Sequence, residues 1–192
     1  MDSGFAWNHG DTQPEIARTF IAIAGPGVRN LGVTQPSDFF TDHVDVRPTL
    51  MFLTGLTDDY QHDGRVVLEM VDPNILPSSL HAHAETLRRL GQVYKQINAP
   101  FGSLAQSTLT ASTFALVSNS PGDVVYANLE TKIASWTDQR DALTAQIKTM
   151  LEGAEFGGLA INEQQAKKII AAGNALLNQA SACAADPVAC SQ

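Results

Sequence analysis

One histidine in a short polar run has the chemistry of a metal ligand. His9 lies in Asn8-His9-Gly10-Asp11, where an imidazole and a carboxylate are two residues apart. A histidine binds a metal through an unprotonated ring nitrogen, and an acceptor usually holds its other N–H. From these residues alone, His9 is interpreted as a loop histidine capped by Gly10, with metal ligation as the alternative. Asp11 is either the acceptor that orients it or an acid of the turn.

Two further histidine patterns do not predict a metal site. His81 and His83 form a His-x-His pair inside a run with helical periodicity. On a helix, side chains two residues apart point about 200° away from each other, so the two cannot share one ion. The pair Asp42-His43 is interpreted as a surface loop or the entry to a helix.

The two cysteines, Cys183 and Cys190, have a spacing that fits neither a zinc knuckle nor a redox Cys-x-x-Cys motif. Pro187 between them is typical of a turn that returns the chain. The pair could therefore form a disulfide at the end of the last helix, which would weakly indicate an exported protein.

The N-terminal region reads as strand, helix and strand. Residues 17–24 form a short apolar run that ends in Gly25-Pro26-Gly27, which predicts a buried strand. Residues 49–53 follow an acid and a proline and end at Gly55, which predicts a short helix. Residues 63–68 read as a turn into a last strand. This order favours the edge of an α/β sheet rather than a complete domain.

These pieces, in this order, resemble the C-terminal portion of the alkaline-phosphatase superfamily, which includes phosphodiesterases, nucleotide pyrophosphatases and sulfatases. The similar residues are Asn8-His9-Gly10-Asp11, then Gly25-Pro26-Gly27, and then Asp45-Val46-Arg47-Pro48-Thr49 before an apolar helix that ends in Gly55-Leu56. The resemblance implies the last strands and helix of an alkaline-phosphatase-like α/β sandwich over residues 4–72. The helical half resembles the C-terminal extensions of secreted bacterial members.

The resemblance also implies a function for a longer parent protein. Such a parent would be a metal-dependent hydrolase of phosphoric or sulfuric esters, with two divalent ions, usually zinc, and His9 as the last ligand of one. Its nucleophile and other ligands would precede His9, so we expect this chain alone to be inactive and to hold neither ion stably. The alternative is a non-enzymatic helical association module with a degraded α/β cap.

The C-terminal region has three helical stripes. Apolar residues alternate at spacings of three and four over residues 126–150, a heptad pattern, and again over residues 80–97. A third stripe, over residues 166–180, follows Asn162 with Gln165 three residues later, as in a capping box. Residues 108–118 are a weaker fourth candidate. We expect a helical hairpin or bundle that could self-associate through these stripes.

Composition separates the two regions. Residues 1–77 contain four Arg and eleven acidic residues, whereas residues 78–192 are nearly neutral, so we expect an α/β region at 1–77 and a helical region at 78–192.

The net charge of −8 argues against binding to nucleic acid. No apolar run is long enough for a membrane span. The resemblance and the cysteine pair together predict an extracellular or cell-envelope location in a bacterium.

Overall fold

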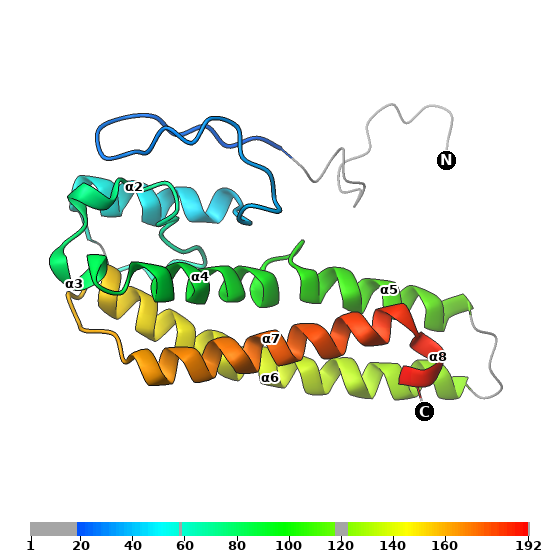
Figure 1. Ribbon diagram of the computed structural model, residues 1–192. Coiled ribbons are helices and arrows are strands. Elements are labelled where there is room, and N and C mark those ends of the chain that lie inside the picture. The colour runs from blue at the N-terminus through cyan, green and yellow to red at the C-terminus, as the bar shows by residue number, and fades with distance from the viewer. Residues whose placement is uncertain (1–18, 58, 118–122, 192) are drawn as a thin grey trace, which may run out of the picture.

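The computed structural model describes residues 19–57, 59–117 and 123–191 (Figure 1). Its body is formed by α4 (Ala84–Asn98), α5 (Ser103–Val117), α6 (Val124–Glu155) and α7 (Glu163–Ala185). Helices α4 and α5 follow one another along nearly one line, and both pack against α6 and α7. The body is therefore a bundle of three rods, one of which is interrupted between α4 and α5.

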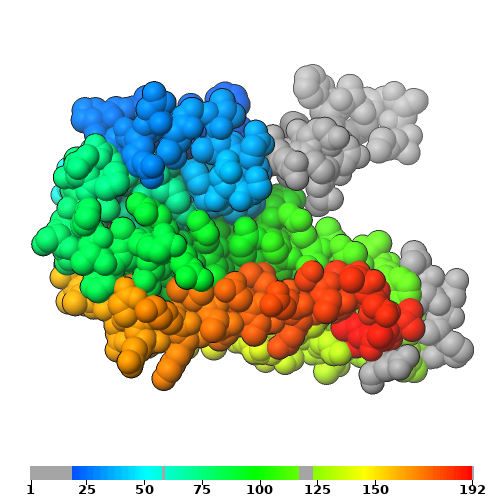
Figure 2. All heavy atoms as spheres, in the orientation of Figure 1, coloured from blue at the N-terminus to red at the C-terminus, as the bar shows by residue number. Residues whose placement is uncertain are grey.

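Shorter elements complete the described fold. They are η1 (His43–Asp45), α2 (Val46–Thr54), η2 (Pro73–Ile75), α3 (Ser78–His81) and α8 (Pro187–Cys190). Residues 19–77 lie over α4 at one end of the bundle, and α8 lies at the other end (Figures 1 and 2). The short helix expected at residues 49–53 is confirmed as α2, which ends at Gly55 in the left-handed conformation (φ 67°).

The heptad stripe of residues 126–150 is confirmed as one face of the 32-residue α6. Its inner positions Leu129, Trp136 and Ile147 are buried. Asp123 precedes α6 but its side chain makes no capping hydrogen bond, and the helix continues past Gly153 to Glu155. Packing against the bundle outweighs the weak helix propensity of a single glycine.

The stripe of residues 80–97 belongs to two helices instead of one. Helix α3 ends at His81, and α4 begins after His83, whose backbone (φ −119°, ψ 13°) is outside the helical region. The cap expected at Asn162 is confirmed, because its side chain accepts a hydrogen bond from the Gln165 N–H at 3.0 Å. The weaker candidate at residues 108–118 is part of α5.

The α/β edge expected within residues 1–77 is wrong for the described part of that range. Residues 19–24 have no regular secondary structure, and the β contact among the described residues is one isolated bridge, Val28–Val71. Residues 66–68 are buried, but their backbone turns locally, with the Leu68 N–H donating to the Val66 carbonyl at 3.0 Å. The helical bundle, instead of neighbouring strands, buries Val66 and Leu68. The burial expected for the other run is also wrong, because residues 19–24 are largely exposed, with Phe20 88% exposed.

Candidate functional site

The predicted metal ligand His9 and its candidate partner Asp11 lie outside the described residues. In the described ranges, no group of three or more His, Cys, Asp or Glu side chains is arranged to hold a metal ion. The histidines that the structure describes are instead distributed over separate elements. His43 is in η1, His62 in the loop after α2, and His81 and His83 on either side of the break before α4.

His83 has a structural role. Its Nδ1 lies 2.8 Å from Oε1 of Glu163, and the Thr86 hydroxyl donates to Oε2 of the same carboxylate at 2.8 Å. These two hydrogen bonds, with that of His83 the larger cause, lower the pKa of Glu163. The contacts connect the start of α4 to the start of α7, so His83 is a helix-to-helix contact in the described structure.

A buried group of charges connects residues 42–69 to α4. Nζ of Lys95 lies 2.7 Å from Oδ1 of Asp42 and 3.1 Å from Oδ1 of Asp45. The Asp45 carboxylate also accepts hydrogen bonds from the Arg65 backbone N–H at 2.9 Å and from the Thr41 hydroxyl at 2.9 Å. Sequence reasoning missed this group, because its members are far apart in the chain.

Arg65 and Glu69 form a second buried ion pair beside it. Two guanidinium nitrogens of Arg65 donate to the two carboxylate oxygens of Glu69, at 2.7 and 3.1 Å. Gln92 of α4 donates to the same carboxylate at 3.2 Å. The spacing of four between Arg65 and Glu69 was the one sequence signal for it, although that spacing usually indicates a helix surface.

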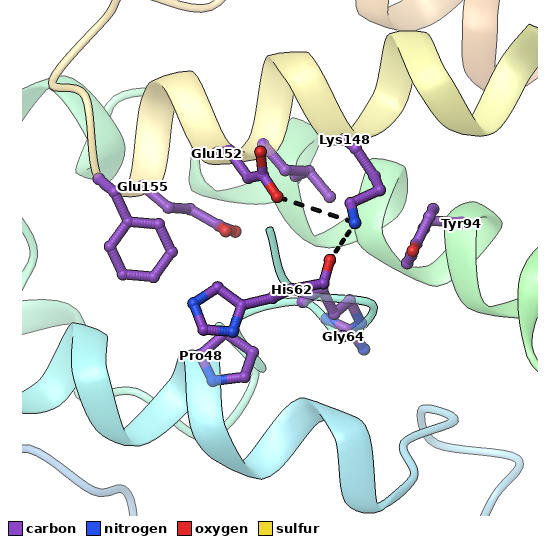
Figure 3. Close-up of a pocket in the computed structure, with 10 residues that line it drawn as sticks. Pro48, His62, Gly64, Tyr94, Lys148, Glu152 and Glu155 are labelled. Carbon is purple, nitrogen blue, oxygen red and sulfur yellow. Dashed lines mark hydrogen bonds and ion pairs between the residues drawn. The ribbon is translucent and has the colours of Figure 1, made fainter. Parts of the chain in front are cut away.

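A cavity of about 10 Å³, the size of one water molecule, lies next to Arg65 and is also lined by the charged residues Lys148, Glu152 and Glu155 (Figure 3). Lys148 of α6 donates to the His62 carbonyl and lies 3.9 Å from Oε1 of Glu152. Oε1 of Glu155 is buried and has no hydrogen-bond partner among the described residues. Burial raises the pKa of Glu155 well above its ordinary value, against the opposing effect of Arg65. The cavity can hold a water but no organic substrate.

Tyr94 of α4 also lines this cavity. Its hydroxyl donates to the Asp63 carbonyl at 2.7 Å and accepts from the Asn98 amide at 3.1 Å. Burial, followed by the nearby Asp63 and Asp45 carboxylates, raises the pKa of Tyr94 above its ordinary value of 10.0. Tyr94 therefore stays protonated and serves as a hydrogen-bond anchor for the loop above it.

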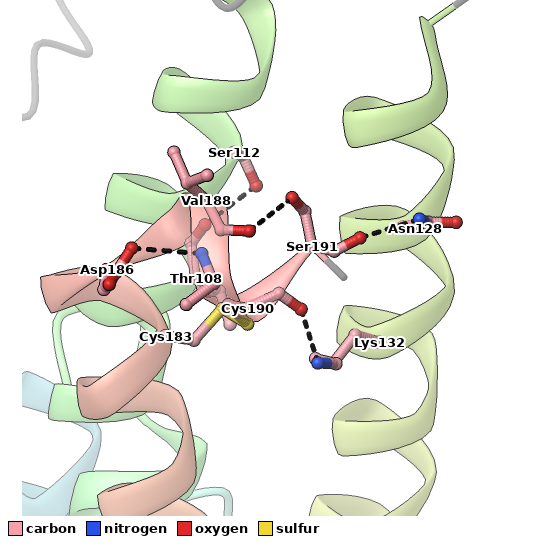
Figure 4. Close-up of a disulfide and its surroundings, with 10 residues drawn as sticks. Thr108, Ser112, Asn128, Lys132, Cys183, Asp186, Val188, Cys190 and Ser191 are labelled. Atoms are coloured by element: carbon pink, nitrogen blue, oxygen red, sulfur yellow. Dashed lines mark hydrogen bonds between the residues drawn. A yellow bond between two sulfur atoms is a disulfide. The ribbon is translucent and has the colours of Figure 1, made fainter.

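A disulfide joins Cys183 of α7 to Cys190 of α8 (Figure 4). On α6, Lys132 donates to the Cys190 carbonyl at 2.5 Å and Asn128 donates to the Ser191 carbonyl at 2.7 Å. The disulfide thus holds α8 against α7, and the two hydrogen bonds connect α8 and Ser191 to α6. Disulfides persist in oxidising compartments, so this bond is weak evidence for an extracellular setting.

Helix α5 has an outward side that no other described element covers. From residue 96 to residue 122 the sequence has no Asp, Glu, Lys, Arg or His. Within this run, the outward side of α5 has Leu109 and Leu116, which are 55% and 73% exposed. Residues 19–77 lie over α4 (Figures 1 and 2). The absence of charge was visible in the sequence, but only the structure shows which side faces outward.

Comparison with known proteins gives no match to a family model, a curated protein or a solved structure. None of the helices in the described ranges is long and apolar enough to cross a membrane. The function is therefore argued from the geometry of the buried charges, the disulfide and the outward side of α5.

Proposed function

We propose that this chain is a non-enzymatic helical association module that holds another polypeptide on the outward side of α5. The observation that carries the proposal is a helix with no charged residue that exposes Leu109 and Leu116. A solvated helix face normally has charged and polar side chains. The centre of a protein interface, in contrast, is depleted of charge and contains exposed apolar anchors.

The rest of the fold supports this role. The buried ion pair of Lys95 with Asp45 and the hydrogen bond from Gln92 to Glu69 hold residues 42–69 on α4, and the disulfide holds α8 on α7. Both ends of the bundle are thus fastened, which leaves α5 as a rigid surface between them. We place the module outside the cell or in the envelope of a bacterium, a setting that the disulfide supports.

In-cell photo-crosslinking tests the proposal. A photo-reactive amino acid replaces Leu116 in the full chain, and a matched control places it at the exposed Glu130 of α6. We expect covalent adducts from position 116 and none from position 130. An absence of adducts at position 116, with the fold intact by circular dichroism, would contradict the association role.

A metal-dependent ester hydrolase remains a second proposal, supported by the order of the motifs at residues 8–11, 25–27 and 45–49. In it, His9 ligates one of two zinc ions in a longer protein that acts on a phosphoric or sulfuric ester. The test is His9→Ala in that longer protein, read by zinc content and ester hydrolysis, with His43→Ala as control. Loss of the ligand should remove up to one of the two zinc ions and lower ester hydrolysis by more than about 100-fold. Equal loss in the two variants would reject the assignment.

A further inference from the structure

The outward side of α5 has a regular pattern of large and small residues. Ala105, Leu109, Ser112 and Leu116 follow at spacings of four, three and four, which is the heptad spacing of a helix–helix contact. Ala105 and Ser112 are half-buried, whereas Leu109 and Leu116 are exposed. The inner side of the same helix is formed by other residues, Leu104, Ala111 and Ala115, which pack into the bundle core. The pattern therefore describes a second contact face of α5, whose Ser112 lies beside α8 and the disulfide (Figure 4).

This outward face is complementary to itself. If two copies of α5 pack antiparallel about a twofold axis between Ser112 and Thr113, Leu109 of each copy lies opposite Leu116 of the other. The small residues Ala105 and Ser112 then provide the holes into which leucines insert. An isologous interface requires this kind of symmetry, in which one patch is its own partner.

Charge selects the same face. The chain has a net charge of −8, so two copies repel one another wherever acidic residues meet. The outer side of α6, by comparison, has exposed acids such as Glu130 and Asp141. The run from residue 96 to residue 122 has no ionisable side chain, so contact there brings no acidic side chains of α5 together.

We infer that the partner of α5 is a second copy of this chain, bound through antiparallel α5 helices with Leu109 and Leu116 at the centre of the interface. This inference rests on the proposed association function and names its partner. The dimer places its twofold axis in the C-terminal half of α5, beside α8 and away from residues 42–69 (Figures 1 and 4).

The first test measures mass by light scattering of the purified full chain over a range of concentrations. We expect twice 20.5 kDa for the wild type. Leu109→Glu and Leu116→Glu should each weaken dimerisation at least about 100-fold, since each brings like charges into the symmetric interface. Leu159→Glu is the matched control, because Leu159 is 64% exposed and lies between α6 and α7. It should remain dimeric.

The second test locates the axis. Thr113→Cys places a thiol next to it, and a short bismaleimide should link two copies covalently. Thr131→Cys on α6 is the control, because both threonines are exposed and both donate to the carbonyl four residues earlier, at 2.8 and 2.9 Å. We expect the covalent dimer from Thr113→Cys alone.

The outcomes separate this inference from the association function. A wild type that stays monomeric, without Thr113→Cys crosslinks, overturns the second copy as partner. If the in-cell adduct at position 116 then has a mass other than two chains, association itself still stands. If the dimer forms only after residues 1–18 are removed, those residues occupy the face in the intact chain, and the inference is again overturned.

Discussion

The Nζ atom of Lys95 lies 3.1 Å from Oδ1 of Asp45, and only 2% and 1% of the two side chains are exposed. Lys95 belongs to α4, whereas Asp45 lies directly before α2. The pair therefore connects the bundle to the segment that covers it. Because both charges are out of water, removing Lys95 leaves the buried Asp45 carboxylate without its cation.

Lys95→Met should consequently destabilise the fold strongly. We expect the free energy of unfolding to fall by about 3–5 kcal/mol, as for other buried pairs with one partner removed. Chemical denaturation measures it. Lys167→Met is the control, because the Lys167 ammonium is 72% exposed in its pair with Glu163, and no measurable change is expected. A loss no larger than in the control would contradict the buried-pair description.

Stability should depend on pH through Glu155. Burial raises the pKa of Glu155 in the folded state above its ordinary value of 4.5, so this carboxyl favours folding most when it is protonated. The contribution is complete below about pH 4.5 and is lost as pH rises through the folded-state pKa. Glu155→Gln should therefore gain stability relative to the wild type with rising pH above 4.5.

The measurement for Glu155 is denaturant unfolding from pH 4 to pH 9. Glu130→Gln, at an exposed position of α6, is the control and should follow the wild type throughout. Parallel curves for Glu155→Gln and the wild type would mean that the carboxyl is ionised in the folded state.

Reduction of the disulfide should loosen the end of the bundle. The sequence has two cysteines, so a reductant acts on the Cys183–Cys190 bond alone. A closed loop of this length contributes about 2 kcal/mol by the chain-entropy estimate. We expect the melting temperature to fall by about 4–8 °C. The backbone N–H groups of Cys190 and Ser191, which donate within α8, should lose hydrogen-exchange protection first.

Helices α4 and α7 pack closely at Gly173. A Cβ atom there would lie 2.3 Å from Cγ1 of Val93. Gly173→Ala should cost about 1–2 kcal/mol of stability, since overpacking outweighs the gain in helix propensity. Val93→Ala in the same chain should recover part of that loss, which a double-mutant cycle detects. Gly153→Ala is the control, because its nearest contact is the flexible tip of Leu159 at 3.2 Å.

The helices could be predicted from the sequence because their signals are local. Spacings of three and four residues fix the inner face of α6, and Asn162 with Gln165 fixes the start of α7. The covering segment could not be predicted, since residues 66–68 have the same apolar pattern whether a sheet or a bundle buries them. Nor could the charge cluster, because Asp45, Arg65 and Lys95 meet only in the folded chain.

The contact between His62 and Lys148 joins residues 86 positions apart in the chain. A ribosome synthesises about 5–20 residues per second, so roughly 4–17 s pass between the appearance of His62 and of Lys148. During that interval the apolar residues 66–68 have no bundle to cover them. The order of synthesis thus exposes the covering segment before its support exists, which makes it a natural binding site for a chaperone on the nascent chain. Nascent chains stalled before and after Lys148 should differ in chaperone crosslinking at these residues, and equal crosslinking would reject this order of events.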